Sequence, residues 1–136
     1  MLLPHLPKWT AARRAAAAAY RRLGLGEHVR LPVETVGAEA CYHLYVARTG
    51  SRDQLVAALS DAGIGARAYY TIPLHRQPAL SAYAADEPLT EVDGAAAECL
   101  ALPMGPGLTE SQVEVVVQAV GEAVSGAPDR PIRAAS

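Results

Sequence analysis

Residues 63–75, GIGARAYYTIPLH, carry the side chains in this chain that are best suited to bind a polar small molecule. If residues 66–71 form a strand, Tyr69 and Tyr70 point to opposite faces, so one packs inward and the other presents its hydroxyl. Pro73 stiffens the backbone that follows and would hold His75 in a defined position. A packed strand end without a binding role accounts for the same residues, and both interpretations remain open at this level.

The rest of the sequence offers no catalytic motif. The other histidines, His5, His28 and His43, are scattered singly, and neither H-x-x-x-H nor C-x-x-C occurs. Cys41 and Cys99 lack partners at metal-ligand spacing, and we expect both to be buried thiols. No G-x-G-x-x-G or P-loop is present. The motifs therefore predict no catalytic residue and no metal site.

Length and charge narrow the class of protein. A chain of 136 residues is expected to form one domain around one core. The formal net charge of −2 disfavours binding to nucleic acid or to an anionic membrane surface. There is no run of 18 apolar residues, and two prolines interrupt the N-terminal MLLPHLPKW. These features predict a cytoplasmic protein.

The elements that would position the 63–75 loop follow from local patterns. Apolar residues at spacings of three and four predict a helix over 8–23, which Gly24 ends. An S-x-x-Q capping box at Ser51 predicts a helix to about residue 62, and a helix capped by Thr90 is expected further along. A second capping box begins at Thr109 and precedes a helical stripe of valines at 113, 116, 117, 120 and 124.

Three short apolar segments are expected to be strands: 41–48, 66–71 and 100–104. They predict an α+β fold with a small three- or four-stranded mixed or antiparallel sheet covered by helices, mainly on one face. Whether neighbouring strands run parallel or antiparallel stays open. We expect an N-terminal extension at 1–5, the domain at 6–124 and a disordered tail at 125–136.

Five short segments occur in an order that is typical of one family. They are YHLY at 42–45, RD at 52–53, the 63–75 loop, TE at 90–91 leading into LALP at 100–103, and LTESQ at 108–112. This order resembles the C-terminal small domain of the DegT/DnrJ/StrS family of pyridoxal-phosphate-dependent sugar aminotransferases, which are fold-type I enzymes. The resemblance covers residues 6–124, nearly the whole ordered chain.

The resemblance implies an enzyme that moves an amino group from glutamate or glutamine onto a keto-sugar nucleotide or a keto-cyclitol. Such enzymes serve sugar, polysaccharide or secondary-metabolite biosynthesis. It also implies that Tyr70, Pro73, Leu74 and His75 face the sugar substrate. Tyr69 joins them as a substrate-side position, although the family usually has histidine there and proline where this chain has Thr71.

The cofactor is not expected to be held by this chain. Transamination requires a lysine that binds pyridoxal phosphate, and the only lysine, Lys8, does not lie in a segment resembling the cofactor-lysine segment. We therefore expect a large cofactor-binding domain, or a second chain that supplies it, to complete the enzyme. In isolation, Trp9 and Tyr20 are expected to form an exposed patch through which the chain could self-associate into a homo-oligomer.

Two further interpretations stay open. The chain could be a non-catalytic module, derived from that domain, which binds a nucleotide-sugar or a partner protein through the 70–75 segment. It could also be a decayed remnant that only folds. The intact helix patterns are compatible with all three.

Overall fold

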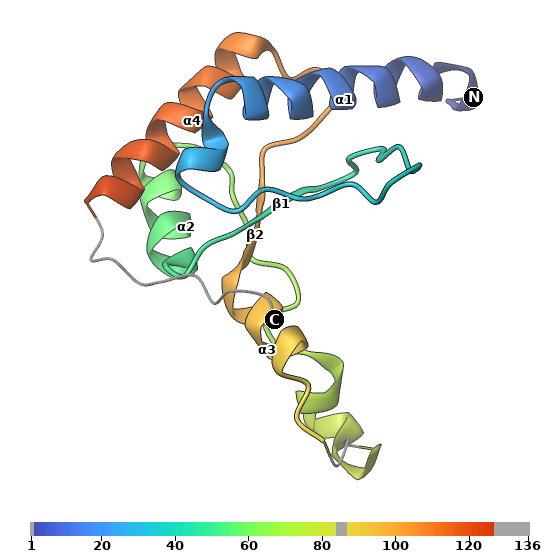
Figure 1. Cartoon of the computed structure of the whole chain (residues 1–136), viewed down its shortest axis with the longest axis vertical. Coiled ribbons are helices and arrows are strands. Elements are labelled where there is room, and N and C mark those ends of the chain that lie inside the picture. Colours follow the sequence, from blue (N-terminus) through green and yellow to red (C-terminus); the bar gives the residue numbers. More distant parts are fainter. Residues whose placement is uncertain (1, 84–86, 127–136) are drawn as a thin grey trace.

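The computed structural model describes residues 2–83 and 87–126. The chain forms a helical body with a two-stranded sheet, from which a narrow arm extends (Figure 1). The helices and strands are α1 (Leu6–Arg22), β1 (Tyr45–Arg48), α2 (Arg52–Asp61), α3 (Thr90–Glu98), β2 (Cys99–Leu102) and α4 (Glu110–Ser125). Four short 3-10 helices complete the described elements: η1 (Leu3–His5), η2 (Leu25–Glu27), η3 (Leu74–Arg76) and η4 (Pro78–Tyr83).

The sheet is antiparallel and small. β1 pairs with β2 in a register that sets Tyr45 opposite Leu102 and Val46 opposite Ala101. Each strand gains one isolated bridge on its other edge, from Arg30 to Arg48 and from Arg67 to Ala101. The α+β class is thus confirmed and the pairing is antiparallel, but the described residues form two full strands where three or four were expected.

Two expected strands are shorter than the sequence pattern indicated. The segment 41–48 is a strand only from Tyr45 onward, because Tyr42 has a φ of 47° and so leaves the extended conformation. The segment 66–71 makes only the bridge at Arg67, and the chain turns at Tyr70, whose φ is 54°. A residue with a left-handed backbone lies outside the β region, so the chain that follows it changes direction and no longer pairs with the neighbouring strand.

One face of the sheet packs on the helices. Tyr45 and Ala47 alternate along β1 and are fully buried in a core shared with α1, α2 and α4. Tyr20 of α1 stacks on Tyr45 with ring centroids 4.8 Å apart, and its hydroxyl donates to the Pro103 carbonyl at 2.7 Å. We predicted that Trp9 and Tyr20 form an exposed patch. That prediction is wrong for Tyr20, which is fully buried, and Trp9 is only partly exposed.

The two capping boxes predicted from the sequence, at Ser51 and Thr109, differ in the structure. The Thr109 capping box forms as predicted: the Thr109 side chain accepts from the Gln112 amide, and the Gln112 side chain accepts from the Thr109 amide. Four of the five stripe valines of α4 are buried. The Ser51 box is wrong, because the Ser51 side chain makes no capping bond and its amide donates instead to the Thr49 hydroxyl. Thr90 is the first residue of α3 and not its cap.

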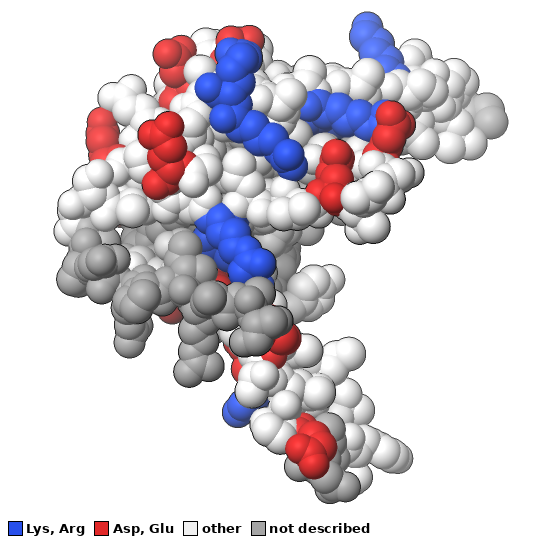
Figure 2. Space-filling view, viewed as in Figure 1, with Lys and Arg blue, Asp and Glu red and all other residues white. Residues whose placement is uncertain are grey.

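The arm comprises the described part of residues 72–98, with η3, η4 and α3 (Figure 1). The body comprises residues 6–62 and 99–126. On the face in Figure 2, basic and acidic side chains are interspersed over the body with no large area of one sign. No helix among the described residues is long and apolar enough to cross a membrane. The tail predicted for 125–136 lies, from residue 127 on, outside the described residues.

Candidate functional site

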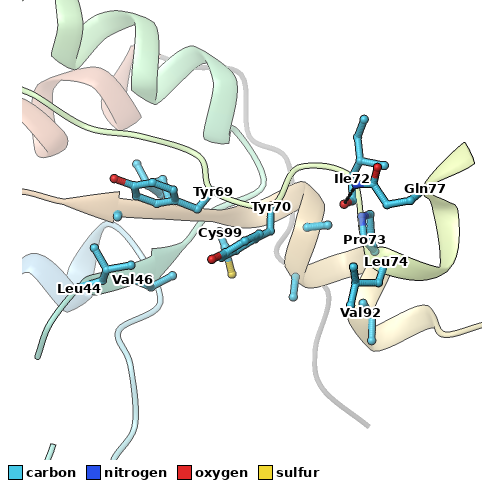
Figure 3. Close-up of a pocket in the computed structure, with 14 residues that line it drawn as sticks. Leu44, Val46, Tyr69, Tyr70, Ile72, Pro73, Leu74, Gln77, Val92 and Cys99 are labelled. Carbon is cyan, nitrogen blue, oxygen red and sulfur yellow. Dashed lines mark hydrogen bonds between the residues drawn. The ribbon is translucent and has the colours of Figure 1, made fainter. Parts of the chain in front are cut away.

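A cavity of about 500 Å³ lies where the arm leaves the body, against the sheet face that the helices do not cover. Val46 and Ala101, which oppose each other in the sheet, form part of its wall. The 69–77 segment and α3 supply most of the remainder (Figure 3). The lining residues are Leu44, Val46, Tyr69, Tyr70, Ile72, Pro73, Leu74, Gln77, Val92, Ala95, Ala96, Cys99, Leu100 and Ala101.

Tyr69 and Tyr70 both line this cavity and do not alternate between opposite faces. Their rings lie 6.5 Å apart and tilted by 45°, and their hydroxyls point the same way in Figure 3. The cause is the left-handed φ of Tyr70, which turns its side chain back toward the side on which Tyr69 lies. A bulky residue in this region carries strain, of the kind that collects at binding sites.

Pro73 and Leu74 continue the same wall. Pro73 has an extended backbone with φ of −60°, which suits its ring, and it immediately precedes η3. The carbonyl of Pro73 accepts the Arg76 amide at 2.9 Å, which closes the turn that begins η3. Four of the five residues chosen from the sequence, namely Tyr69, Tyr70, Pro73 and Leu74, therefore meet at one cavity.

His75, the fifth residue, does not line the cavity. Its Nε2 lies 3.1 Å from Oδ1 of Asp93 on α3. Arg76 holds the same carboxylate with two hydrogen bonds, Nε to Oδ1 and Nη2 to Oδ2, each 2.6 Å long. The hydrogen bonds from Arg76 are the main reason that the pKa of Asp93 is lowered, and Asp93 in turn raises the pKa of Arg76. This cluster ties η3 to α3 behind the cavity.

A second set of polar contacts fixes α3 to the body. Arg48, at the end of β1, places Nε and Nη2 at 3.0 and 2.9 Å from Oε2 of Glu98, the last residue of α3. Arg52 of α2 donates to the Ala96 carbonyl. Glu98 is one of only two polar or charged residues that are buried within the described chain. The wall formed by α3 is therefore held by charges at its end.

The sequence analysis missed several wall residues. Leu44 and Val46 alternate with the buried Tyr45 and Ala47, so their period of two indicated the second sheet face. Val92, Ala95 and Ala96 have helical spacing on α3, but nothing in the sequence pairs that face with the 69–77 segment. Cys99 lines the cavity and is partly buried, which raises the pKa of its thiol, whereas Cys41 is exposed, contrary to our expectation.

The chemistry of the cavity is that of a binding surface. Its lining contains two phenols, one carboxamide and the Cys99 thiol, with no lysine and no carboxylate. Lys8 lies exposed in the first turn of α1 and is not part of the lining. These residues do not fit the requirements for holding pyridoxal phosphate, which needs a lysine and an acidic partner. No group of three or more metal-ligating side chains occurs within residues 2–83 and 87–126.

The chain is similar in sequence and in structure to several known proteins. The "Pleiotropic regulatory protein" of Geobacillus stearothermophilus is 42% identical over 123 residues, covering 88% of this chain and 33% of the relative. The "dTDP-3-amino-3,4,6-trideoxy-alpha-D-glucose transaminase" of Streptomyces venezuelae is 35% identical over 122 residues, covering 88% and 32%. The crystal structure of a DegT DnrJ EryC1 StrS aminotransferase from Brucella abortus superposes with a TM-score of 0.83 at 28% identity, over 90% of this chain and 33% of that one.

This chain thus spans about a third of the length of the relatives it matches. The family model described as the DegT/DnrJ/EryC1/StrS aminotransferase family matches residues 1–121. That match covers the arm, the cavity and all of the body except residues 122–126. The chain belongs to the DegT/DnrJ/EryC1/StrS aminotransferase family.

Proposed function

We propose that this chain is the small domain of a pyridoxal-phosphate-dependent aminotransferase that acts on a nucleotide-linked keto-sugar. The observation that carries the proposal is the cavity, because four of the residues that the family resemblance assigns to the substrate side line it. Its volume of about 500 Å³ and its mainly apolar wall are typical of small-molecule sites. Relatives such as the Streptomyces venezuelae enzyme are transaminases of dTDP-linked sugars.

In this proposal the residues have separate roles. Tyr69 and Tyr70 offer hydroxyls to the sugar, while Pro73 and Leu74 form an apolar wall that excludes water from it. His75 acts as a positioning residue, since its ring is bound to Asp93 and so helps to set the angle of the loop. The substrate would be oriented here and would react with a group held elsewhere.

The remaining part of the enzyme supplies the cofactor site. Pyridoxal phosphate, when bound, provides the carbonyl and the electron sink through which an amino group moves. We assign its lysine and its acidic partner to the large domain, whether that domain lies in the same polypeptide or in a second chain. This chain matches only about a third of the length of its relatives, and the other two thirds of those relatives are long enough to contain such a domain.

A second candidate function is a non-catalytic module that binds a nucleotide-sugar or a partner protein. Two observations favour it. A relative that is 42% identical is described as a pleiotropic regulatory protein. This chain also has Tyr69 and Thr71 in the loop where the family resemblance implies histidine and proline. The same cavity would then serve recognition alone.

A chimeric enzyme tests the catalytic proposal. Residues 1–136 replace the matching third of the Streptomyces venezuelae transaminase, and amino transfer to that enzyme's own keto-sugar is measured. We expect activity to be retained. We expect Tyr70→Phe to lower kcat/KM about tenfold, because one hydrogen bond is worth roughly 1–1.5 kcal/mol.

Tyr83→Phe is the matched control for this experiment. Tyr83 is 84% exposed and Tyr70 is 87% exposed, but only Tyr70 lines the cavity, so Tyr83→Phe should leave kcat/KM unchanged. A chimera that folds and binds pyridoxal phosphate, yet transfers no amino group, contradicts the catalytic proposal. If the unmodified chain nonetheless binds nucleotide-sugars, that result favours the recognition module.

A further inference from the structure

Residues 68–72, which we call the strap, connect the edge of the sheet to the arm and are anchored at both ends. Just before the strap, Arg67 and Ala101 exchange two backbone hydrogen bonds of 3.1 and 2.7 Å. At its far end, the Gln77 side chain donates to the Ile72 carbonyl at 2.9 Å. The path of the chain between these two anchors depends on the backbone conformation of the residues in the middle of the strap.

Tyr70, in the middle of the strap, has a strained backbone with few restraints. Its φ of 54° lies in the left-handed region, which is costly for a bulky residue. Tyr42 has a similar φ of 47°, but it is partly buried and its hydroxyl donates to Glu34 at 3.0 Å. Tyr70 is 87% exposed, and its backbone enters no hydrogen bond with the backbone of residues 2–83 and 87–126. Strain that the surroundings do not enforce can be released by a change of conformation.

The edge of β2 offers the strap a second conformation. The antiparallel register of the Arg67 bridge would pair Tyr69 with Cys99 as the next hydrogen-bonded pair along the edge. That pair does not form, because the chain turns away at Tyr70, and the Cys99 amide is bound instead to the Ala95 carbonyl. An extended backbone at Tyr70 would lengthen the edge pairing by one pair, in competition with the last hydrogen bond of α3.

The two conformations place the Tyr70 phenol on different faces of the sheet. With Tyr70 left-handed, both tyrosines line the cavity (Figure 3). In an extended strand, successive side chains alternate between the faces. This alternation is already present before the strap, since Ile64 and Ala66 pack against the core whereas Arg67 is exposed. Continued through the strap, it keeps Tyr69 at the cavity and turns Tyr70 toward the face that the helices cover.

We propose that the strap is a conformational switch with two states. In one state Tyr70 is left-handed and both phenols face the cavity. In the other Tyr70 is extended, Tyr69 pairs with Cys99, and the Tyr70 phenol is withdrawn. A molecule in the cavity selects the first state, because only that state offers it both hydroxyls. The inference rests on the proposed function in that it describes regulation of the same site, although the interconversion itself needs no ligand.

The test compares two substitutions at Tyr70 that remove the same phenol and act oppositely on the backbone. Glycine adopts a positive φ readily, whereas a β-branched valine is disfavoured there. Hydrogen exchange of the Tyr69 amide is measured by NMR in the full 136-residue chain for Tyr70→Gly and Tyr70→Val. The Tyr69 amide is hydrogen-bonded to Cys99 only in the extended state. We therefore expect it to exchange about tenfold more slowly in Tyr70→Val than in Tyr70→Gly.

The same two substitutions at Tyr83 are the control. Tyr83 is 84% exposed and lies on η4, outside the strap, so both variants should give the Tyr69 amide the exchange rate of the unmodified chain. None of the four substitutions changes the intrinsic rate of this amide, which is set by residues 68 and 69. The amides of α4 report whether each variant is folded.

Equal exchange of the Tyr69 amide in Tyr70→Gly and Tyr70→Val overturns the inference. A difference that the Tyr83 variants reproduce also overturns it, because the effect would then not come from the strap. Neither result bears on the proposed function, since no sugar is present in this experiment. The proposed function is tested separately by amino transfer in the chimeric enzyme.

Discussion

The body and the arm of this molecule are held together by different forces. Every buried apolar side chain of the described residues belongs to residues 16–59 or 100–120, around the Tyr20 and Tyr45 stack. The arm between residues 72 and 98 buries a single described residue, Glu98. It is fastened to the body by the Arg48–Glu98 ion pair and braced internally by the Arg76–Asp93 ion pair. The body is thus stabilised by burial, and the arm is positioned by charge.

This difference separates the part of the domain that carries most of its stability from the part that forms much of the cavity wall. Burial of apolar surface gives most of the stability of a fold and does not depend on direction. Ion pairs contribute less but set orientation, because they require particular atoms to meet. The cavity lies at the junction of the two regions, so its sheet side belongs to the packed body and its arm side rests on the Asp93 and Glu98 contacts.

The largest expected effect compares one leucine from each region. Leu59→Ala in α2 removes a side chain with 0% exposure and should destabilise the fold by about 2–5 kcal/mol, because a cavity remains in the core. Leu74→Ala in the arm removes a side chain that is 75% exposed and should change stability by no more than about 0.5 kcal/mol. Urea unfolding of both variants measures this. Similar losses would remove the distinction between body and arm.

The next effect concerns the ion pair that joins the two regions. Glu98→Ala leaves Arg48 without its partner at a largely buried position, and we expect a loss of about 2–3 kcal/mol. Glu39→Ala removes the partner of Arg14 in an exposed pair and should cost less than about 1 kcal/mol. Thermal unfolding gives both values. A loss at Glu98 no larger than at Glu39 would mean that the arm is held by something other than this contact.

The smallest effect is local and depends on pH. The hydrogen bonds of Arg76 lower the pKa of Asp93 in the folded chain, so the contact contributes stability above the ordinary Asp value of about 3.9. That contribution is lost as the pH falls through the lower folded-state value. We expect the amide shifts of residues 74–77 to change below about pH 4, while those of residues 16–20 in α1, which include no carboxylate, hold.

Asp93→Asn should abolish this local transition, because an amide does not titrate. Asp53→Asn is the control, since Asp53 is an exposed carboxylate that also contacts an arginine, Arg52, but lies on α2 in the body. Its amide shifts at residues 74–77 should follow those of the unmodified chain. A transition that persists in Asp93→Asn would assign it to another group.

The sequence predicted those parts of the fold that depend on neighbours along the chain. The 3.6-residue period of the valines in α4 and the Thr109 capping box both appear as expected, and Gly24 takes the left-handed φ of 85° that ends the first helix. The Ser51 box failed although it has the same pattern, a hydroxyl residue followed three positions later by glutamine, because the nearby Thr49 hydroxyl accepts the Ser51 amide. A local motif is reliable only where no competing acceptor is near.

For the candidate site, too, some features follow from the sequence and others only from the tertiary structure. The sequence by itself predicted that residues 63–75 concentrate candidate binding groups, since this follows from the residue types within one segment. Only the tertiary structure decided that Tyr69 and Tyr70 turn to one side, that α3 closes the wall and that His75 faces Asp93. The partners that hold the arm in place are far apart in the sequence: His75 and Asp93 are 18 positions apart, and Arg48 and Glu98 are 50. Such pairings depend on how whole elements pack, which no short-range pattern encodes.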